Sequence, residues 1–269
     1  MKFIYSVQFT SVFKKERRGI VLAFLLLAIM SVSCKKNKFE DFPAVCQVFN
    51  AIDNNVHLYT NLSLSRPIIF NSARELKNKD SVLKNTMLIM HEFPQTLQLF
   101  TTTDTLPENG PVLNTVLDVK EREIYSLFVY GQKSAVSHTL VHEMIPHSNF
   151  QDSSCNIRFA NFSSTAVISI NLKGEPPGSF IQSLAAKTLS AFTPLLFNLT
   201  TDKSYDFEIR DHATGDLITT YNMSSDKNKL EFSRHWLWGP TTLVLTGHPG
   251  EPSPNHQRIS PMFHQVYRD

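Results

Sequence analysis

Short segments in which apolar and polar residues alternate recur along most of the chain. In residues 97–99 and 207–209 one face is apolar and the other polar, which is the period of a half-buried β-strand. Further segments of this kind lie at 56–59, 86–90, 112–119 and 139–145. About seven strands per 100 residues, separated by turn-forming residues, predict an all-β chain built from antiparallel β-sandwiches. Two segments, 72–83 and 178–190, are predicted to form short helices.

The strand-like segments occur in two copies. Three pairs of segments align: 46–51 with 155–160, 96–100 with 204–209, and 124–131 with 240–247. A repeat of more than 100 residues is longer than the 20–50 residues of a solenoid unit and indicates a duplicated domain. We therefore predict two tandem β-sandwich domains at 44–147 and 154–269, joined by a polar segment that follows Pro146.

The first 33 residues have the pattern of a secretory signal peptide. A basic cluster at 14–18 precedes an uncharged, mostly apolar run at 20–33. As a helix this run would rise about 21 Å, less than the ~30 Å hydrocarbon core of a bilayer. A basic flank, a short apolar run and small residues before a cleavage point predict a signal peptide, with an uncleaved membrane anchor as the alternative.

The sequence at the end of this segment, Ser31-Val-Ser-Cys34, resembles a bacterial lipobox. Ser31 stands where leucine is usual. The resemblance implies that the Cys34 thiol is acylated, with fatty acids such as palmitate, and becomes the mature N-terminus, so that 34–43 is a tether. Lys35 after the cysteine favours the outer membrane, with the periplasmic and the surface side both open. The membrane is then a partner of the chain through this lipid.

The leader and the remainder of the chain have net charges of opposite sign. The formal net charge is +2, but residues 1–33 contribute five basic side chains and one acidic side chain. Without them, 21 basic and 23 acidic residues remain, a net charge of −2. This balance lacks the basic surface that nucleic-acid binding requires, so we expect no nucleic-acid partner.

Several strands carry motifs in a characteristic order. Residues 157–165 read Ile-Arg-Phe-Ala-Asn-Phe-Ser-Ser-Thr, and the strand-like segments 125–131 and 241–247 both end in glycine. In this order the motifs resemble the tandem immunoglobulin-like repeats of unknown function in lipoproteins of Bacteroides-type bacteria. The first copy lacks the arginine. The resemblance implies a sandwich fold and export, and it implies no reaction, no catalytic residue and no cofactor.

A histidine-rich segment is the best candidate for catalysis. His142 and Glu143 are followed by His147, but this spacing of five and the intervening Pro146 do not fit the zinc-protease helix. In a strand, His138 and His142 share one face and could bind a metal only with a third ligand. We expect no metal site, and a metal-dependent hydrolase that uses His138, His142 and Glu143 is the weakest of three functional hypotheses.

Two tryptophans form a candidate binding surface. In a strand, Trp236 and Trp238 would point to the same face, next to Arg234. Such a group can stack on sugar rings or contact a peptide. The alternative is that one or both indoles cover the sandwich core.

Four further residues could be covalently modified or cross-linked in the envelope. Cys46 and Cys155 could form a disulfide there, but two buried free thiols in separate domains are the simpler expectation. Ser81 and Thr105 fit the three-residue O-glycosylation signal of Bacteroides-type exported proteins.

Together these observations favour a lipid-anchored, non-enzymatic interaction module in adhesion, envelope architecture or an uptake complex. The anchor and the duplicated sandwich are its basis, together with the lack of a Gly-x-Ser-x-Gly elbow, a P-loop or a Gly-x-Gly-x-x-Gly loop. A glycan-binding surface protein that uses the tryptophans is the first alternative.

Overall fold

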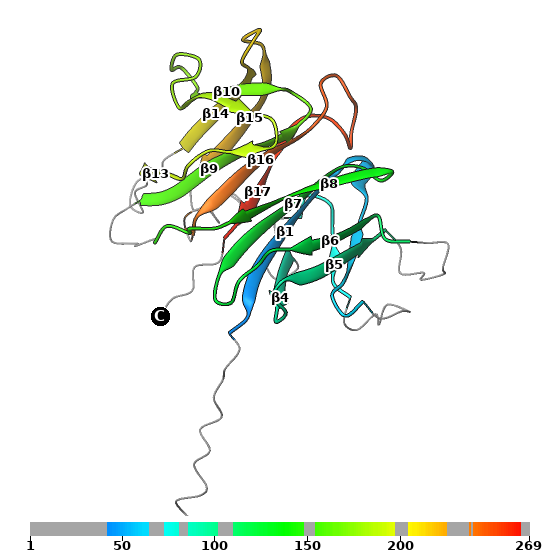
Figure 1. Ribbon diagram of the computed structural model, residues 1–269. Helices are drawn as coiled ribbons and strands as arrows, with labels where there is room; N and C mark the ends of the chain where they lie inside the picture. Colours follow the sequence, from blue (N-terminus) through cyan, green and yellow to red (C-terminus); the bar gives the residue numbers. More distant parts are fainter. Residues whose placement is uncertain are drawn as a thin grey trace, which may run out of the picture. The chain divides into compact units, whose positions relative to one another are not determined.

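The computed structural model describes residues 42–64, 73–80, 86–101, 110–147, 154–196, 204–224, 237 and 239–264. These residues form strands arranged in four sheets (Figure 1). The all-β prediction is confirmed, since the sheets pack in sandwich-like pairs. Along most of β5, for example, buried side chains alternate with half-buried ones.

The first pair of sheets is built from the N-terminal half of the chain. The first inner sheet has the order β4 (Met87–Met90), β1 (Ala44–Ile52), β7 (Ile124–Gln132), β8 (Ala135–His142). The first outer sheet has the order β3 (Glu75–Leu76), β2 (Leu58–Asn61), β5 (Gln95–Phe100), β6 (Leu113–Leu117). A 3-10 turn, η1 (Asp53–Asn55), follows β1.

The second pair repeats this arrangement. The second inner sheet has the order β12 (Thr188–Leu189), β9 (Ser154–Ser163), β16 (Thr241–Gly247), β17 (Arg258–Phe263), and β13 (Thr193–Leu196) also pairs with β9. The second outer sheet has the order β11 (Ile181–Ala185), β10 (Val167–Leu172), β14 (Ser204–Asp211), β15 (Leu217–Ser224). Both predicted helices are wrong, because the described part of 72–83 contains β3 and 178–190 contains β11 and β12.

Each inner sheet contains one parallel pair in an otherwise antiparallel arrangement. β1 pairs in parallel with β7, and β9 pairs in parallel with β16. Parallel neighbours need a long crossover connection, which here runs through the outer sheet of the same pair. The strands at the centre of each inner sheet are therefore far apart in the sequence.

Two glycines occupy the same place in the two inner sheets. Gly131 pairs with Ile52 and Gly247 pairs with Ser163. Both have positive φ, and a Cβ atom at Gly247 would lie 2.3 Å from the carbonyl oxygen of His256, so a side chain does not fit. The glycine that ends each copy of the sequence motif is thus required by the backbone.

A buried asparagine that occurs in both copies shows how the first strand of one copy, β1, corresponds to that of the other, β9. Asn50 and Asn161 are both buried and each donates from Nδ2 to two backbone carbonyl groups. The carbonyl group of Asn50 accepts the backbone N–H of Lys79, and that of Asn161 accepts the N–H of Lys187. Asn50 therefore corresponds to Asn161, and the predicted alignment of 46–51 with 155–160 is wrong by two residues. The predicted match of 124–131 with 240–247 agrees with the strand pairing. The predicted match of 96–100 with 204–209 contains the positions that correspond, 97–99 and 207–209.

Three apolar clusters stabilise the fold. One fills the space between the first inner and outer sheets, and one fills the equivalent space in the second pair. The third lies between the two inner sheets and is formed mainly by Phe49, Ala51, Phe128, Ala160, Phe162, Val244 and Met262. We call this contact between the inner sheets the seam.

The described residues form one compact unit that begins at Phe42. No helix among them is long and apolar enough to cross a membrane. The predicted signal peptide at 1–33 lies outside the described residues, as do 148–153 at the predicted boundary between the two copies.

Candidate functional site

Aromatic side chains occupy the centre of the seam. The rings of Phe128 on β7 and Phe162 on β9 stack with centroids 4.5 Å apart and planes 12° apart. Phe49 and Tyr130 pack beside them, with centroids 6.1 Å from Phe128 and 5.2 Å from Phe162, respectively. Because the three phenylalanine rings are large and buried, with Tyr130 partly buried beside them, they supply much of the apolar contact between the inner sheets.

A buried cluster of polar side chains lies at one end of the seam, which we call the ion-pair cluster. Arg158 on β9 donates from Nη2 to Oε1 of Glu143, which follows β8, at 2.5 Å, and both side chains are almost fully buried. Arg158 Nε also donates to Oγ1 of Thr242 at 2.8 Å, and the guanidinium lies 4.4 Å from the centre of the Phe192 ring. His264 completes the cluster, with Nε2 2.7 Å from Thr242 Oγ1. The ion pair joins the two inner sheets.

The environment of His264 keeps its imidazole neutral. Burial, assisted by the nearby charge of Arg158, lowers the pKa of His264 to about 3. Protonation would place a second positive charge beside Arg158, with Glu143 as the one carboxylate in the ion-pair cluster. Protonating His264 should therefore favour unfolding.

We expect acid to destabilise the protein through His264. The unfolded histidine has a pKa near 6.5, so between that pKa and the folded pKa of about 3 the unfolded state binds the extra proton. The free energy of unfolding should then fall by about 2 kcal/mol between pH 7 and pH 5 through this residue alone. Urea unfolding of the wild type and His264→Gln across this range measures the difference, and parallel pH profiles would contradict the expectation.

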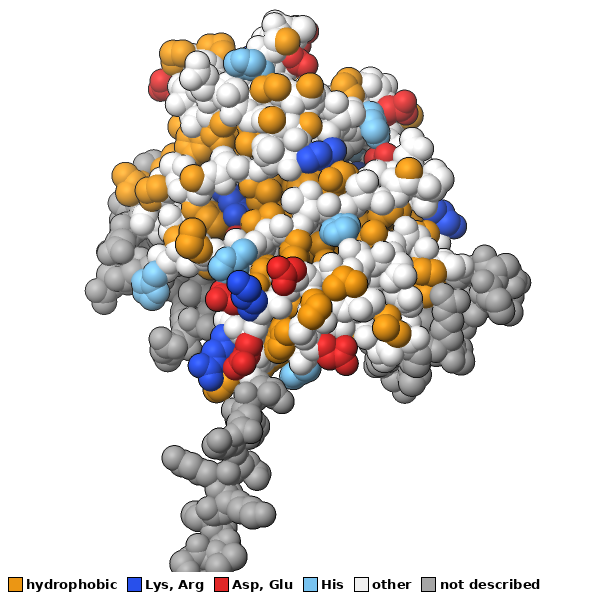
Figure 2. Space-filling view, in the orientation of Figure 1, with side chains coloured by type: hydrophobic (Ala, Val, Ile, Leu, Met, Phe, Trp, Pro, Cys, Tyr) orange, Lys and Arg blue, Asp and Glu red, His pale blue; other side chains and the backbone are white. Residues whose placement is uncertain are grey.

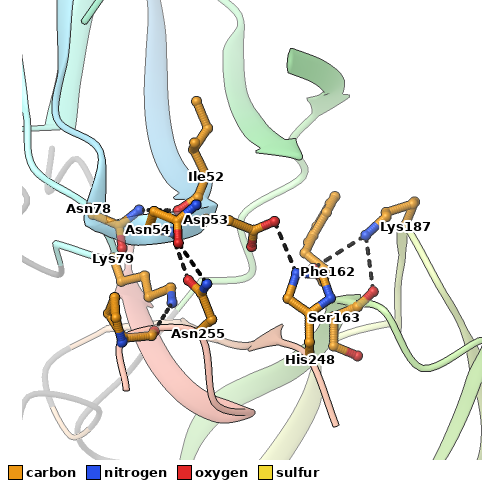
Figure 3. A network of polar contacts seen from close by, with 11 residues as sticks. Ile52, Asp53, Asn54, Asn78, Lys79, Phe162, Ser163, Lys187, His248 and Asn255 are labelled. Carbon is orange, nitrogen blue, oxygen red and sulfur yellow. Dashed lines mark hydrogen bonds and ion pairs between the residues drawn. The ribbon is translucent and has the colours of Figure 1, made fainter. Parts of the chain in front are cut away.

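A second polar cluster lies at the opposite end of the seam, which we call the loop cluster (Figure 3). Asp53 in η1 accepts a hydrogen bond from Nε2 of His248, which follows β16, at 2.9 Å. Beside it, Asn54 and Asn255 bind each other twice: the backbone N–H of Asn54 donates to Oδ1 of Asn255 at 2.7 Å, and Asn255 Nδ2 donates back to Asn54 Oδ1 at 2.8 Å. Both contacts join segments about 200 residues apart in the sequence.

Two lysines flank the loop cluster. Lys79 donates from Nζ to the carbonyl oxygen of Pro254 at 3.2 Å, and Lys187 donates to that of Ser163 at 3.0 Å (Figure 3). Burial lowers the pKa of both lysines, that of Lys79 to about 8, and the charge of Asp53 opposes this shift. Lys79 reaches from the first pair of sheets to the second, so it adds another contact across the seam.

A small cavity opens beside the loop cluster. Its volume is about 60 Å³, and its lining includes Asp53, Phe162, Lys187, Gly247 and His248. This volume accommodates a few water molecules, whereas pockets for small-molecule ligands measure about 300–1,000 Å³. Asp53 and His248 beside it bind each other across the seam, and Lys187 binds Ser163 within the second pair of sheets.

The histidine-rich segment does not assemble a metal site. His138 Nε2 lies 3.3 Å from Oγ1 of Thr115, and His142 Nε2 lies 2.5 Å from a carboxylate oxygen of Glu123. Glu143 is buried in its ion pair with Arg158. In the described part of the chain, no group of three or more His, Cys, Asp or Glu side chains could hold a metal ion. The hydrolase hypothesis therefore loses the arrangement of residues that it required.

The two cysteines of the body are buried thiols, as predicted. Burial raises the pKa of Cys46 to about 12, assisted by the charge of Glu143, and burial raises that of Cys155 to about 12 as well. The Sγ atom of Cys155 donates a hydrogen bond to the carbonyl oxygen of Gly239 at 3.1 Å. Both thiols are thus protonated at neutral pH and unreactive.

Several predicted site residues lie outside the described residues. They are the lipidation site Cys34, the possible binding residues Arg234, Trp236 and Trp238, and the possible O-glycosylation sites Ser81 and Thr105. The lipid anchor, the glycan-binding surface and the two modification sites therefore stay predictions from the sequence.

Comparison with known proteins gives distant likenesses. No protein-family model matches the sequence, and no curated protein matches it. Among solved structures, a "putative adhesin" from Bacteroides ovatus aligns with 87% of this chain and 99% of its own, at 11% identity and a TM-score of 0.23. The fimbrial anchor protein Mfa2 from Porphyromonas gingivalis aligns with 81% of this chain and 95% of its own, at 7% identity and a TM-score of 0.23. Because both TM-scores are low, the function proposed below is based on the residues of this chain.

Proposed function

We propose that the protein is an exported, lipid-anchored envelope protein that acts by binding other molecules and not by catalysis. The export signal at 1–33 and Cys34 in its lipobox-like context support attachment to the outer membrane. The body beyond the tether supplies stable β-sheets with loops at their ends, which is where β-sandwich proteins commonly bind partners. Adhesion and envelope architecture are the roles that fit such a body.

The interlocked seam is the observation that carries this proposal. Its charged groups are used to join the two inner sheets: Arg158 binds Glu143 at one end, and Asp53 binds His248 at the other. Charged side chains that serve catalysis are instead directed into a substrate-sized cleft. A body fixed in this way suits a rigid element that presents a binding surface at a constant distance from the membrane.

The lipid anchor is tested by replacing its acceptor thiol. We expect the full chain, expressed in a Bacteroides-type host fed an alkyne fatty acid, to be labelled and to fractionate with the outer membrane. Cys34→Ala should abolish the label and release the protein from the membrane, whereas Cys46→Ala is the matched control that should keep both. Labelling of the Cys34→Ala variant, or an unlabelled wild type with an intact N-terminus, would overturn the proposal.

The binding role is tested in the same host. Deleting the gene and restoring it as wild type or Cys34→Ala separates effects of the anchored protein from those of its mere presence. We expect adhesion of the cells to surfaces or to one another to fall on deletion and to recover with the anchored form alone. Adhesion that is unchanged by deletion would refute this role and leave the lipid anchor unaffected.

A further inference from the structure

Large apolar side chains are exposed at the end of the first inner sheet where β1 begins. Phe42 is 45% exposed, Ile89 51%, Phe93 39% and Met144 86%. Among the described residues, eight large hydrophobic side chains are exposed, and these four belong to this one end. Single exposed apolar residues are common on protein surfaces, but a group at one end indicates a contact surface.

The strand pairing places these four side chains at the same end of the sheet. Ala44 pairs with Met90, so the turn after β4 passes beside the residues that precede β1. The backbone N–H of Glu143 donates to the carbonyl oxygen of Ile124, which places Met144 next to the start of β7. We call the region around Phe42, Ile89, Phe93 and Met144 the entry end. Figure 2 shows hydrophobic, basic and acidic side chains mixed at the lower tip of the described residues, where β1 begins in Figure 1.

The length of the tether places the entry end close to the proposed anchor. Eight peptide units separate Cys34 from Phe42, and a fully extended chain of that length spans at most about 28 Å. Since β1 starts immediately after Phe42 and Pro43, the tether joins the body at the entry end. A bilayer held at Cys34 is therefore within reach of the entry end.

The charges of the entry end decide what kind of contact this is. Among the described residues of this end two side chains are basic, Lys120 and Arg122, and the guanidinium of Arg122 lies 3.9 Å from the centre of the Phe42 ring. Four carboxylates belong to the same end: Glu92, Asp118, Glu121 and Glu123. This balance does not attract anionic headgroups, so the aromatic and apolar side chains must supply the attraction.

We infer that the entry end rests on the bilayer to which Cys34 is attached, with Phe42, Phe93 and Met144 in its interfacial zone. Aromatic side chains favour this zone, and a lipid anchor holds even a small apolar surface at high local concentration. The inference rests on the proposed lipid anchor. It sets an orientation: β1 runs away from the membrane, and η1 with the loop cluster faces outward.

Site-directed fluorescence tests this orientation in the lipidated full-length protein. A polarity-sensitive dye is attached to a cysteine introduced by Glu92→Cys or Met144→Cys, and Leu217→Cys is the matched control. The vesicles are made of phosphatidylethanolamine and phosphatidylcholine with nitroxide-labelled lipids. We expect quenching to remove roughly half of the dye emission at 92 and 144, and none at 217, at low and at high salt.

The protein suits this experiment because its native thiols do not interfere. Cys34 is the acylated residue, and Cys46 and Cys155 are buried. Leu217 is exposed like the probe positions but begins β15, which pairs with the end of β14. That end of β14 lies beside the start of β10. β10 follows β9 in the chain, and β9 ends at the far end of the seam, so Leu217 lies away from the entry end.

The outcomes separate the inference from the proposed anchor. Quenching at 92 and 144 that disappears in Phe42→Ser/Phe93→Ser, without a change in melting temperature, supports the contact. Vesicle-bound protein that is quenched equally at all three positions, or at none, refutes the contact while the anchor stands. Protein that does not bind vesicles and carries no acyl mass at Cys34 refutes the anchor itself.

Discussion

Glu143→Leu is expected to lower the free energy of unfolding by about 3–5 kcal/mol, because it leaves the charge of Arg158 buried without its partner. Both side chains are almost fully buried, and the ion pair is the charged contact between the inner sheets at this end of the seam. Removing one member of a buried pair costs more than the pair contributes, since the remaining charge keeps its desolvation penalty. Urea unfolding followed by circular dichroism measures the loss.

Two further variants make this expectation specific to the buried pair. The double variant Arg158→Met/Glu143→Leu should recover most of the stability, to within about 1–2 kcal/mol of the wild type, because no unpaired charge remains. Glu121→Leu removes the carboxylate of an exposed ion pair with Arg122 and should change stability by less than about 1 kcal/mol. A double variant as unstable as Glu143→Leu alone would show that lost packing, and not the unpaired charge, causes the effect.

The strands of the outer sheets could be predicted from the sequence because each has one buried and one exposed face. In β5 and β14 the alternation of apolar and polar residues is visible, and the predicted match of 96–100 with 204–209 contains the positions that correspond in the structure, 97–99 and 207–209. Asn61 and Asn171 each donate to the side chain at the aligned position, Gln98 and Glu208, respectively. Such a pattern fixes the register because a shift by one residue would expose the apolar face.

The first strand of each copy could not be aligned in the same way. β1 and β9 are buried along almost their whole length, since one face contacts the outer sheet and the other the seam. A strand that is buried on both faces shows no alternation, so its register cannot be read from apolar residues. The matching cysteines suggested an offset of 109, whereas the buried Asn50 and Asn161 give 111.

The predicted helices failed for a different reason. Residues 178–190 contain alanine, leucine and glutamine, which favour helices, but the segment lies at sheet edges, where β11 pairs with β10 and β12 pairs with β9. Backbone pairing with strands that are already in place outweighs a weak local preference. Such tertiary contacts cannot be derived from the segment itself.

The seam was missed because its partners come from distant parts of the sequence. In the sequence Glu143 stands beside His142 and Arg158 lies in a strand motif, and nothing in either segment points to the other. One signal was available: an arginine in an apolar strand must find a partner when that strand is buried. The sequence shows that such a partner is needed, but the partner's identity depends on how the inner sheets pack.

The two pairs of sheets should unfold independently when the aromatic centre of the seam is removed. Phe128 is fully buried and stacks on Phe162 across the seam, so Phe128→Ala should lower stability by about 3–5 kcal/mol and weaken the coupling between the sheet pairs. We expect one urea transition for the wild type and two for the variant. Phe207→Ala is the matched control, since Phe207 is equally buried but lies within the second pair of sheets, away from the seam. It should lose similar stability in one transition, and a split transition in this variant alone would contradict the role assigned to the seam.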